Sequence, residues 1–394
     1  MIKGQNNSGA GNAGLRHEQA PLSYSVCSGK PPFMPGDKLD NSTKLPGKIF
    51  RYIHFILAIS VAGCSAAGDK GLESSSRDSS LKWITDTSVP THAENGVAKL
   101  QFIGAGGFYL SLPQGGVLVD PFYSNPGLLS LASLRTLVPD TQTIDRYLPP
   151  PDDINAVLIG HVHFDHALDL PYIASKLAES ARIYGSATLK NSLATAIASD
   201  RLIDVEPGMS VDGRGGQWLM LAPHLRVFPI KSEHAPHIGS WVFGSGNVEK
   251  PLDHVPEDVL DWQAGVNISY LLDLLDDEKR PVYRVFIQTS ASSSPNGLAP
   301  NSVLDDGKAV DMAVLCAANY DKMEHYPEYL LERMSPQKVV LVHWEKFWTP
   351  YEPGQASPLP GLNIDNLYRR INAVLPQAEV SILQRGAILS WSLN

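Results

Sequence analysis

Only three of the 394 residues are cysteines, and Cys27, Cys64 and Cys316 lie far apart in the chain. This spacing favours neither a disulfide framework nor a zinc site built from cysteines, and Cys316, inside an apolar run, is predicted to be buried. Lys and Arg form no block and the net charge is −9, which argues against a nucleic-acid partner. With 43% hydrophobic and 19% charged residues, the composition is that of an ordinary globular protein with a large core.

The N-terminal region differs in composition from the rest of the chain. Residues 1–43 are rich in Gly, Ser, Asn, Pro and Lys without apolar periodicity, which indicates disorder or an upstream mis-start of the reading frame. Residues 44–64 combine basic residues, an apolar stretch of about a dozen residues and a small-residue end, as signal peptides do. The apolar stretch is too short for a comfortable membrane span.

The end of this segment, Val61-Ala62-Gly63-Cys64, resembles the lipobox of bacterial lipoproteins, in which the cysteine is lipidated. The resemblance implies that Cys64 attaches the mature chain to a membrane. Ser65 after it resembles the pattern that sorts lipoproteins to the outer membrane, so the expected location is the bacterial cell envelope, on the periplasmic side. A plain secretory peptide is the alternative. Residues 65–95 are predicted to be a flexible tether, and residues 96–394 a single domain.

The most informative stretch lies between a predicted buried strand and a predicted helix. The apolar run 156–159 is followed, after one glycine, by His161-Val162-His163-Phe164-Asp165-His166. A loop lets these three imidazoles and one carboxylate converge on one or two ions. Such ligands suit zinc, with iron or manganese possible. The alternative is a polar loop in which Asp165 caps the following helix.

This stretch resembles the H-x-H-x-D-H signature of the metallo-β-lactamase-fold hydrolases, and the resemblance extends from about Ala98 to the C-terminus. It points in particular to the branch that includes ascorbate-phosphate lactonases and N-acyl-phosphatidylethanolamine phospholipases. The implied fold is in the α/β class, an αβ/βα four-layer sandwich of two mixed β-sheets. From the residues themselves, only alternating strands and helices are predicted, with metal-binding residue types at strand ends.

The resemblance also implies which later histidines complete the site. His234 follows a predicted strand and is expected to be a ligand, while His237 is the alternative ligand or a substrate-facing group. His343 ends the apolar run 338–342, where the family's last metal histidine falls. The implied ligand sets are His161, His163 and His234 for one ion, and Asp165, His166 and His343 for the other.

Two acidic positions of the family need separate treatment. Asp120 ends a predicted strand and matches the family's first motif, an acid that supports the metals from behind; otherwise it caps a turn. A later strand ends in Gln288-Thr289, where the family usually carries an aspartate that bridges two metals. Direct alignment places Thr289 at that position, and a shift of one residue places Gln288 there. Because neither is anionic, one firmly held metal, two metals bridged by hydroxide alone and an impaired site are all possible.

The function that the resemblance implies is a metal-dependent hydrolase, with zinc expected. A metal-activated water would attack an ester, lactone, amide or phosphodiester, and Asp165 would orient that water or accept its proton. The substrate is expected to be a small or lipid-like molecule, since aromatic residues follow His343 and could wall an apolar pocket or belong to the core. These aromatic residues are Trp344, Phe347, Trp348 and Tyr351. A non-catalytic or mono-metal binding module on the same fold is the alternative.

Overall fold

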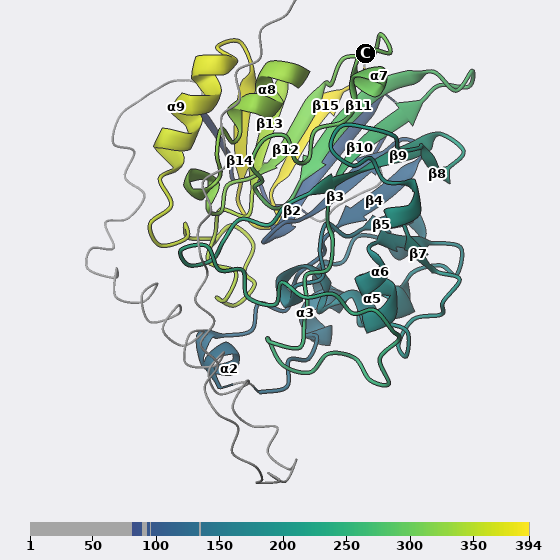
Figure 1. Cartoon of the computed structure of the whole chain (residues 1–394), viewed down its shortest axis with the longest axis vertical. Helices are drawn as coiled ribbons and strands as arrows, with labels where there is room; N and C mark the ends of the chain where they lie inside the picture. The colour runs from purple at the N-terminus through teal and green to yellow at the C-terminus, as the bar shows by residue number, and fades with distance from the viewer. Residues whose placement is uncertain (1–80, 89–92, 95, 134, 394) are drawn as a thin grey trace, which may run out of the picture. The chain divides into compact units, whose positions relative to one another are not determined.

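The computed structural model describes residues 81–88, 93–94, 96–133 and 135–393 (Figure 1). The predictions for residues 1–80, which include the signal peptide, the lipidation of Cys64 and the first part of the tether, lie outside the described residues. Within the described ranges, no helix is both long and apolar enough to cross a membrane.

The described chain forms two mixed β-sheets, which confirms the predicted α/β fold class. The eight-stranded sheet has the order β1 (Leu81–Ile84), β14 (Glu379–Leu383), β13 (Lys338–Val342), β12 (Met312–Cys316), β11 (Pro281–Gln288), β10 (Asn267–Leu275), β9 (Leu225–Ser232) and β8 (Leu219–Ala222). The seven-stranded sheet has the order β15 (Ile388–Ser392), β2 (Val97–Gly104), β3 (Gly107–Leu112), β4 (Gly115–Val119), β5 (Ile154–Leu158), β6 (Arg182–Gly185) and β7 (Leu202–Asp204). Each sheet has a parallel part, from β1 to β11 and from β4 to β7, and an antiparallel part.

Helices cover the outer faces of the two sheets, as a four-layer arrangement requires (Figure 1). The seven-stranded sheet is accompanied by α2 (Leu128–Ala132), α3 (Thr141–Tyr147), η1 (Pro151–Asp153), α4 (Phe164–Ala167), α5 (Leu170–Lys176), α6 (Ala187–Ser192) and η2 (Glu206–Gly208). The eight-stranded sheet is accompanied by α7 (Asn301–Leu304), η3 (Tyr320–Lys322), α8 (Glu328–Met334) and α9 (Ile364–Val374).

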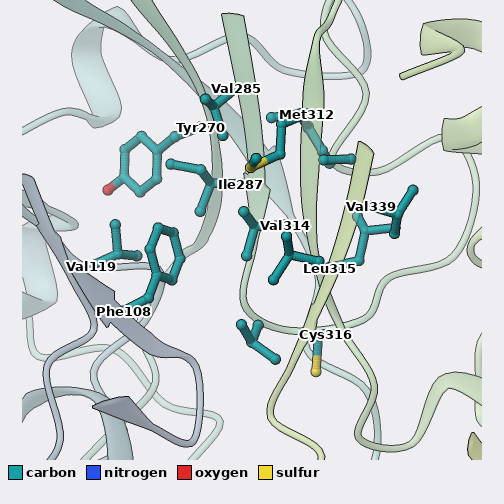
Figure 2. Packing of buried hydrophobic residues seen from close by; sticks show 14 of the residues in the cluster. Phe108, Val119, Tyr270, Val285, Ile287, Met312, Val314, Leu315, Cys316 and Val339 are labelled. Carbon is teal, nitrogen blue, oxygen red and sulfur yellow. The ribbon is translucent and has the colours of Figure 1, made fainter. Parts of the chain in front are cut away.

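The main core lies between the two sheets, where alternate residues of facing strands are apolar. Figure 2 shows Phe108 and Val119 of the seven-stranded sheet beside Tyr270 and Ile287 of the other sheet. Cys316 is buried in this same core, as predicted. The hydroxyl of Tyr270 crosses the interface and donates a 2.8 Å hydrogen bond to the carbonyl of residue 159, directly before the histidine-rich loop. The core therefore also fixes the start of that loop.

Strand β1 corrects the predicted tether, which was expected to extend to residue 95. Leu81–Ile84 pair in parallel with β14, and the Trp83 ring packs edge-on against Trp344 at 5.2 Å between centroids. Leu81 and Trp83 of β1 flank Lys82, whose amine lies 2.8 Å from a carboxylate oxygen of Glu379. This segment is therefore part of the sheet and not a linker.

Candidate metal centre

Strand ends bring the predicted site residues together. Asp120 follows β4, His161 follows β5, His234 follows β9, Thr289 follows β11 and His343 follows β13. The carboxyl ends of these strands meet at one edge of the two-sheet sandwich, where α/β proteins usually place their sites. The six predicted ligands form two triads, and within each triad the three ligand atoms lie within 4.8 Å of one another. The first triad is His161, His163 and His234, and the second triad is Asp165, His166 and His343.

The first triad consists of three imidazoles whose lone pairs are available. Nε2 of His161 lies 3.1 Å from Nδ1 of His163. Two nitrogens bound tetrahedrally to one zinc ion at about 2.0–2.1 Å would be roughly 3.3 Å apart, so this spacing fits a shared ion. Burial lowers the pKa of His163 to about 4, and lowers those of His161 and His234 well below the ordinary value. All three rings are therefore neutral at pH 7, as metal ligation requires.

The second triad contains a carboxylate between two imidazoles. Oδ2 of Asp165 lies 3.2 Å from Nε2 of His343 and 3.6 Å from Nε2 of His166. Burial alone would raise the pKa of Asp165, but His166 and His343 outweigh it and lower the pKa below its usual range. Asp165 is therefore ionised. The two triads are adjacent, since the His161 and His166 ring centroids are 3.9 Å apart.

Asp120 supports the second triad from behind, in the place that its motif predicts. Its Oδ1 accepts a 2.8 Å hydrogen bond from the backbone N–H of Gly160, and its Oδ2 lies 2.8 Å from Nδ1 of His166. Burial would lower the pKa of His166, but Asp165 and Asp120 outweigh it and raise the pKa. When the His166 ring is neutral and its Nδ1 donates to Asp120, Nε2 carries the lone pair. Among the described residues this buried Nε2 has no hydrogen-bond partner, as expected of a ligand atom.

The structure decides between the two residues that could occupy the position of the family's bridging aspartate. A Cβ atom added to Gly160 would lie 2.4 Å from Oγ1 of Thr289 and 3.1 Å from Oδ2 of Asp120, so Thr289 faces the site. Gln288 points to the opposite face of the strand, where its amide nitrogen lies 2.8 Å from the Ser292 hydroxyl. The site thus carries a neutral hydroxyl at this position.

Two glycines allow this close packing. A Cβ atom added to Gly106 would lie 2.8 Å from the His166 ring and 2.9 Å from Cβ of Thr289. The turn that contains Gly106 and the loop that begins with Gly160 can approach the site only because both lack a side chain.

The backbone at the site is held in an unusual conformation. Ala105, Asp120 and His343 have positive φ angles of 48°, 39° and 56°. Each such non-glycine residue costs about 1–3 kcal/mol and persists only where its surroundings hold it. The backbone N–H of His343 donates to the Ala105 carbonyl at 2.7 Å, and the Ala105 N–H donates to Glu345 at 2.8 Å. These bonds join the strand ends of the two sheets.

Two buried charged residues that were not predicted from the sequence hold the segment after His343. Glu345 and Arg385 are fully buried, and Nη2 of Arg385 lies 3.5 Å from the Glu345 carboxylate. The same guanidinium donates to the carbonyls of Lys346 and Pro350 at 2.7 and 3.1 Å. A charged residue two positions after a strand-end histidine was the available signal, because buried charges need partners.

The aromatic residues after His343 have two different roles. Trp344 is fully buried in the core, and its indole N–H donates to the Leu383 carbonyl at 3.1 Å, so the pocket interpretation is wrong for this residue. Phe347 is only partly buried, and its ring centroid lies 5.3 Å from that of His343. Its ring centroid also lies 6.2 Å from that of Phe164, the first residue of α4. Phe347 thus forms an apolar side of the second triad.

His237 lies beside the first triad but outside both ligand groups. Its ring centroid is 4.8 Å from that of His234 and 5.6 Å from that of His163. Burial and the neighbouring His163 lower its pKa to about 3, so the ring is neutral at pH 7.

Comparisons with known proteins give limited similarity. No protein-family model matches the chain. A UPF0173 metal-dependent hydrolase of Myxococcus xanthus is 29% identical over 111 residues, which cover 28% of this chain and 33% of that protein. The chain thus matches about a third of the length of this relative.

Solved structures with similar folds include Igni18, a metallo hydrolase of Ignicoccus hospitalis, with 15% identity, a TM-score of 0.45 and coverage of 75% of this chain and 99% of that chain. YhfI of Bacillus subtilis, a metallo-β-lactamase-fold protein, has 16% identity, a TM-score of 0.44 and coverage of 75% and 100%.

Proposed function

We propose that the protein is a metal-dependent hydrolase with a two-ion site, and that the ions are zinc. The observation that carries the proposal is the pair of adjacent triads, in which His234 and His166 are oriented by hydrogen bonds through Nδ1 and keep Nε2 for a metal. Bound divalent ions would supply Lewis acidity and an activated water. The Myxococcus xanthus relative is named a metal-dependent hydrolase, which supports the same class for this chain.

Within this proposal, the residues of the two triads have different tasks. The first triad would hold one ion through three neutral nitrogens, and the second triad would hold the other through two nitrogens and the Asp165 carboxylate. Asp165 is the ionised group in the second triad, so it is the residue that can orient a water or accept its proton. Asp120 keeps His166 in the tautomer that presents Nε2.

The proposed substrate carries an ester, lactone, amide or phosphodiester bond and an apolar part. Ester, lactone, amide and phosphodiester bonds all place an electrophilic carbon or phosphorus beside an oxygen that gains charge. The half-buried ring of Phe347 beside His343 favours a substrate with an apolar part. We also propose that lipidation of Cys64 tethers the protein to the cell envelope, which would bring it close to lipid-like or acylated molecules.

A binding module with one ion or none is the second candidate, and the neutral Thr289 at the site favours it. Metal content and hydrolysis, measured on the full chain purified without chelator, separate the two. About two zinc ions per chain and turnover of a member of an ester, lactone, amide and phosphodiester panel are expected for the wild type. His161→Ala and His343→Ala should each lose one ion. A wild type that binds zinc but hydrolyses nothing would favour the binding module, and one that binds no transition metal would overturn the hydrolase.

A further inference from the structure

Two histidines three residues apart in the segment after β9 are fixed in opposite tautomers. Nδ1 of His234 lies 2.6 Å from the Ala235 carbonyl, which can only accept, so Nδ1 carries the proton. Nδ1 of His237 accepts a 3.1 Å hydrogen bond from the backbone N–H of Phe243, which can only donate. His234 therefore presents a lone pair at Nε2, and His237 presents an N–H there.

The position of His237 is fixed on several sides. Its backbone N–H donates to the Trp241 carbonyl at 2.8 Å, and its own carbonyl accepts from the Lys322 amine at 2.7 Å. Its ring centroid lies 5.3 Å from that of Phe243 and 4.8 Å from that of His234. Within the described part of the chain, Nε2 of His237 makes no hydrogen bond. A rigidly held donor without a protein partner thus lies beside the first triad.

We propose that His237 is a hydrogen-bond donor that binds an oxygen atom of the substrate at the first triad, and that it is not a metal ligand. This inference rests on the proposed function. Ligation through Nε2 would require the proton to move to Nδ1, where it would face the Phe243 N–H and remove the bond that fixes the ring. A neutral N–H donor instead fits the carbonyl or phosphoryl oxygen on which negative charge develops during hydrolysis.

The tautomer test needs neither metal nor substrate. Long-range ¹H–¹⁵N spectra of the metal-free full chain, labelled at histidine and assigned with His234→Gln and His237→Gln, should show Nε2–H for His237 and Nδ1–H for His234. A protonated Nδ1 on His237 would overturn the inference.

Zinc and inorganic phosphate test the role itself. His237→Gln should keep the zinc stoichiometry of the wild type, whereas His234→Gln should lose one ion per chain. In calorimetric titrations of the zinc-loaded proteins, His237→Phe should bind phosphate about tenfold more weakly than the wild type, the size expected for one lost donor. His237→Gln, whose amide can still donate, should recover part of that loss. Equal phosphate binding by wild type and His237→Phe would contradict the role.

These results separate this inference from the proposed function. A zinc-binding wild type in which His237→Gln loses an ion overturns the inference alone. A wild type that takes up no zinc overturns the proposed function, and the donor role with it.

Discussion

The two triads lie side by side, but they differ in net charge and in the groups that orient their histidines. The first triad contains no anionic group, and its His234 is oriented by a backbone carbonyl. The second triad contains the ionised Asp165, and its His166 is oriented by the Asp120 carboxylate. Negative charge is thus concentrated on one side of the site. Negative charge strengthens the binding of a dication. Metal binding at the second triad therefore depends on two carboxylates, whereas metal binding at the first triad depends on geometry alone.

The largest effect is expected when the charge of the second triad is removed. Asp165→Asn should lower kcat/KM for a hydrolysed substrate about 10³-fold, because one change removes both a ligand and the candidate proton acceptor. Elemental analysis should show the first ion retained. Asp169→Asn, which alters a buried carboxyl outside both triads, is the matched control and should keep both ions. Full activity in Asp165→Asn would show that the carboxylate has no such role.

A smaller effect is expected when the support of the second triad is changed. Asp120→Asn should weaken zinc binding at the second triad about 10- to 100-fold, since the amide no longer favours the Nδ1–H tautomer of His166. Competition with a chromophoric chelator measures the two affinities separately. The first triad should keep its affinity, and an equal loss at both triads would mean that the site is not divided in this way.

The neutral Thr289 allows a direct test of how the missing carboxylate affects the second triad. Thr289→Asp should strengthen zinc binding at the second triad by about tenfold, as an added carboxylate neutralises part of the dication charge. Without metal, the new carboxylate would lie beside Asp120 and should destabilise the protein in chemical denaturation. In Thr289→Asn the new side chain has nearly the shape of aspartate without its charge. This variant should neither strengthen zinc binding nor destabilise the metal-free protein. Unchanged zinc affinity in Thr289→Asp would place the missing carboxylate elsewhere.

The candidate ligands could be predicted because their signal is local. H-x-H-x-D-H lies within six residues, and His234 and His343 each end an apolar run, so strand prediction alone places them at one edge. The choice between Gln288 and Thr289 could not be made, because a shift of one residue moves a side chain to the other face of a strand.

Features that depend on partners far away in the sequence, or on single backbone hydrogen bonds, could not be predicted. Strand β1 pairs with β14, which lies near the opposite end of the chain, so its four residues give no sign of their partner. The ion pair between Glu345 and Arg385 likewise joins residues 40 positions apart. The tautomers of His234 and His237 depend on single backbone hydrogen bonds that no residue pattern encodes.

The smallest effect concerns the proton uptake of the two triads in metal-free protein. The pKa of His163 falls from 6.5 to about 4 on folding, chiefly through burial. The unfolded chain then binds more protons, so this residue's contribution to stability is complete above pH 6.5 and decreases as the pH falls toward 4. Between pH 6.5 and 5.5 the free energy of unfolding should fall by about 1 kcal/mol in urea titrations, and His163→Asn should lack this decrease.

His166, whose pKa is raised, acts with the opposite sign: its contribution to stability is complete below pH 6.5 and decreases as the pH rises. His166→Asn should therefore change the pH dependence above 6.5 instead. If both variants changed the same pH range, the two triads would not differ in charge as the structure indicates.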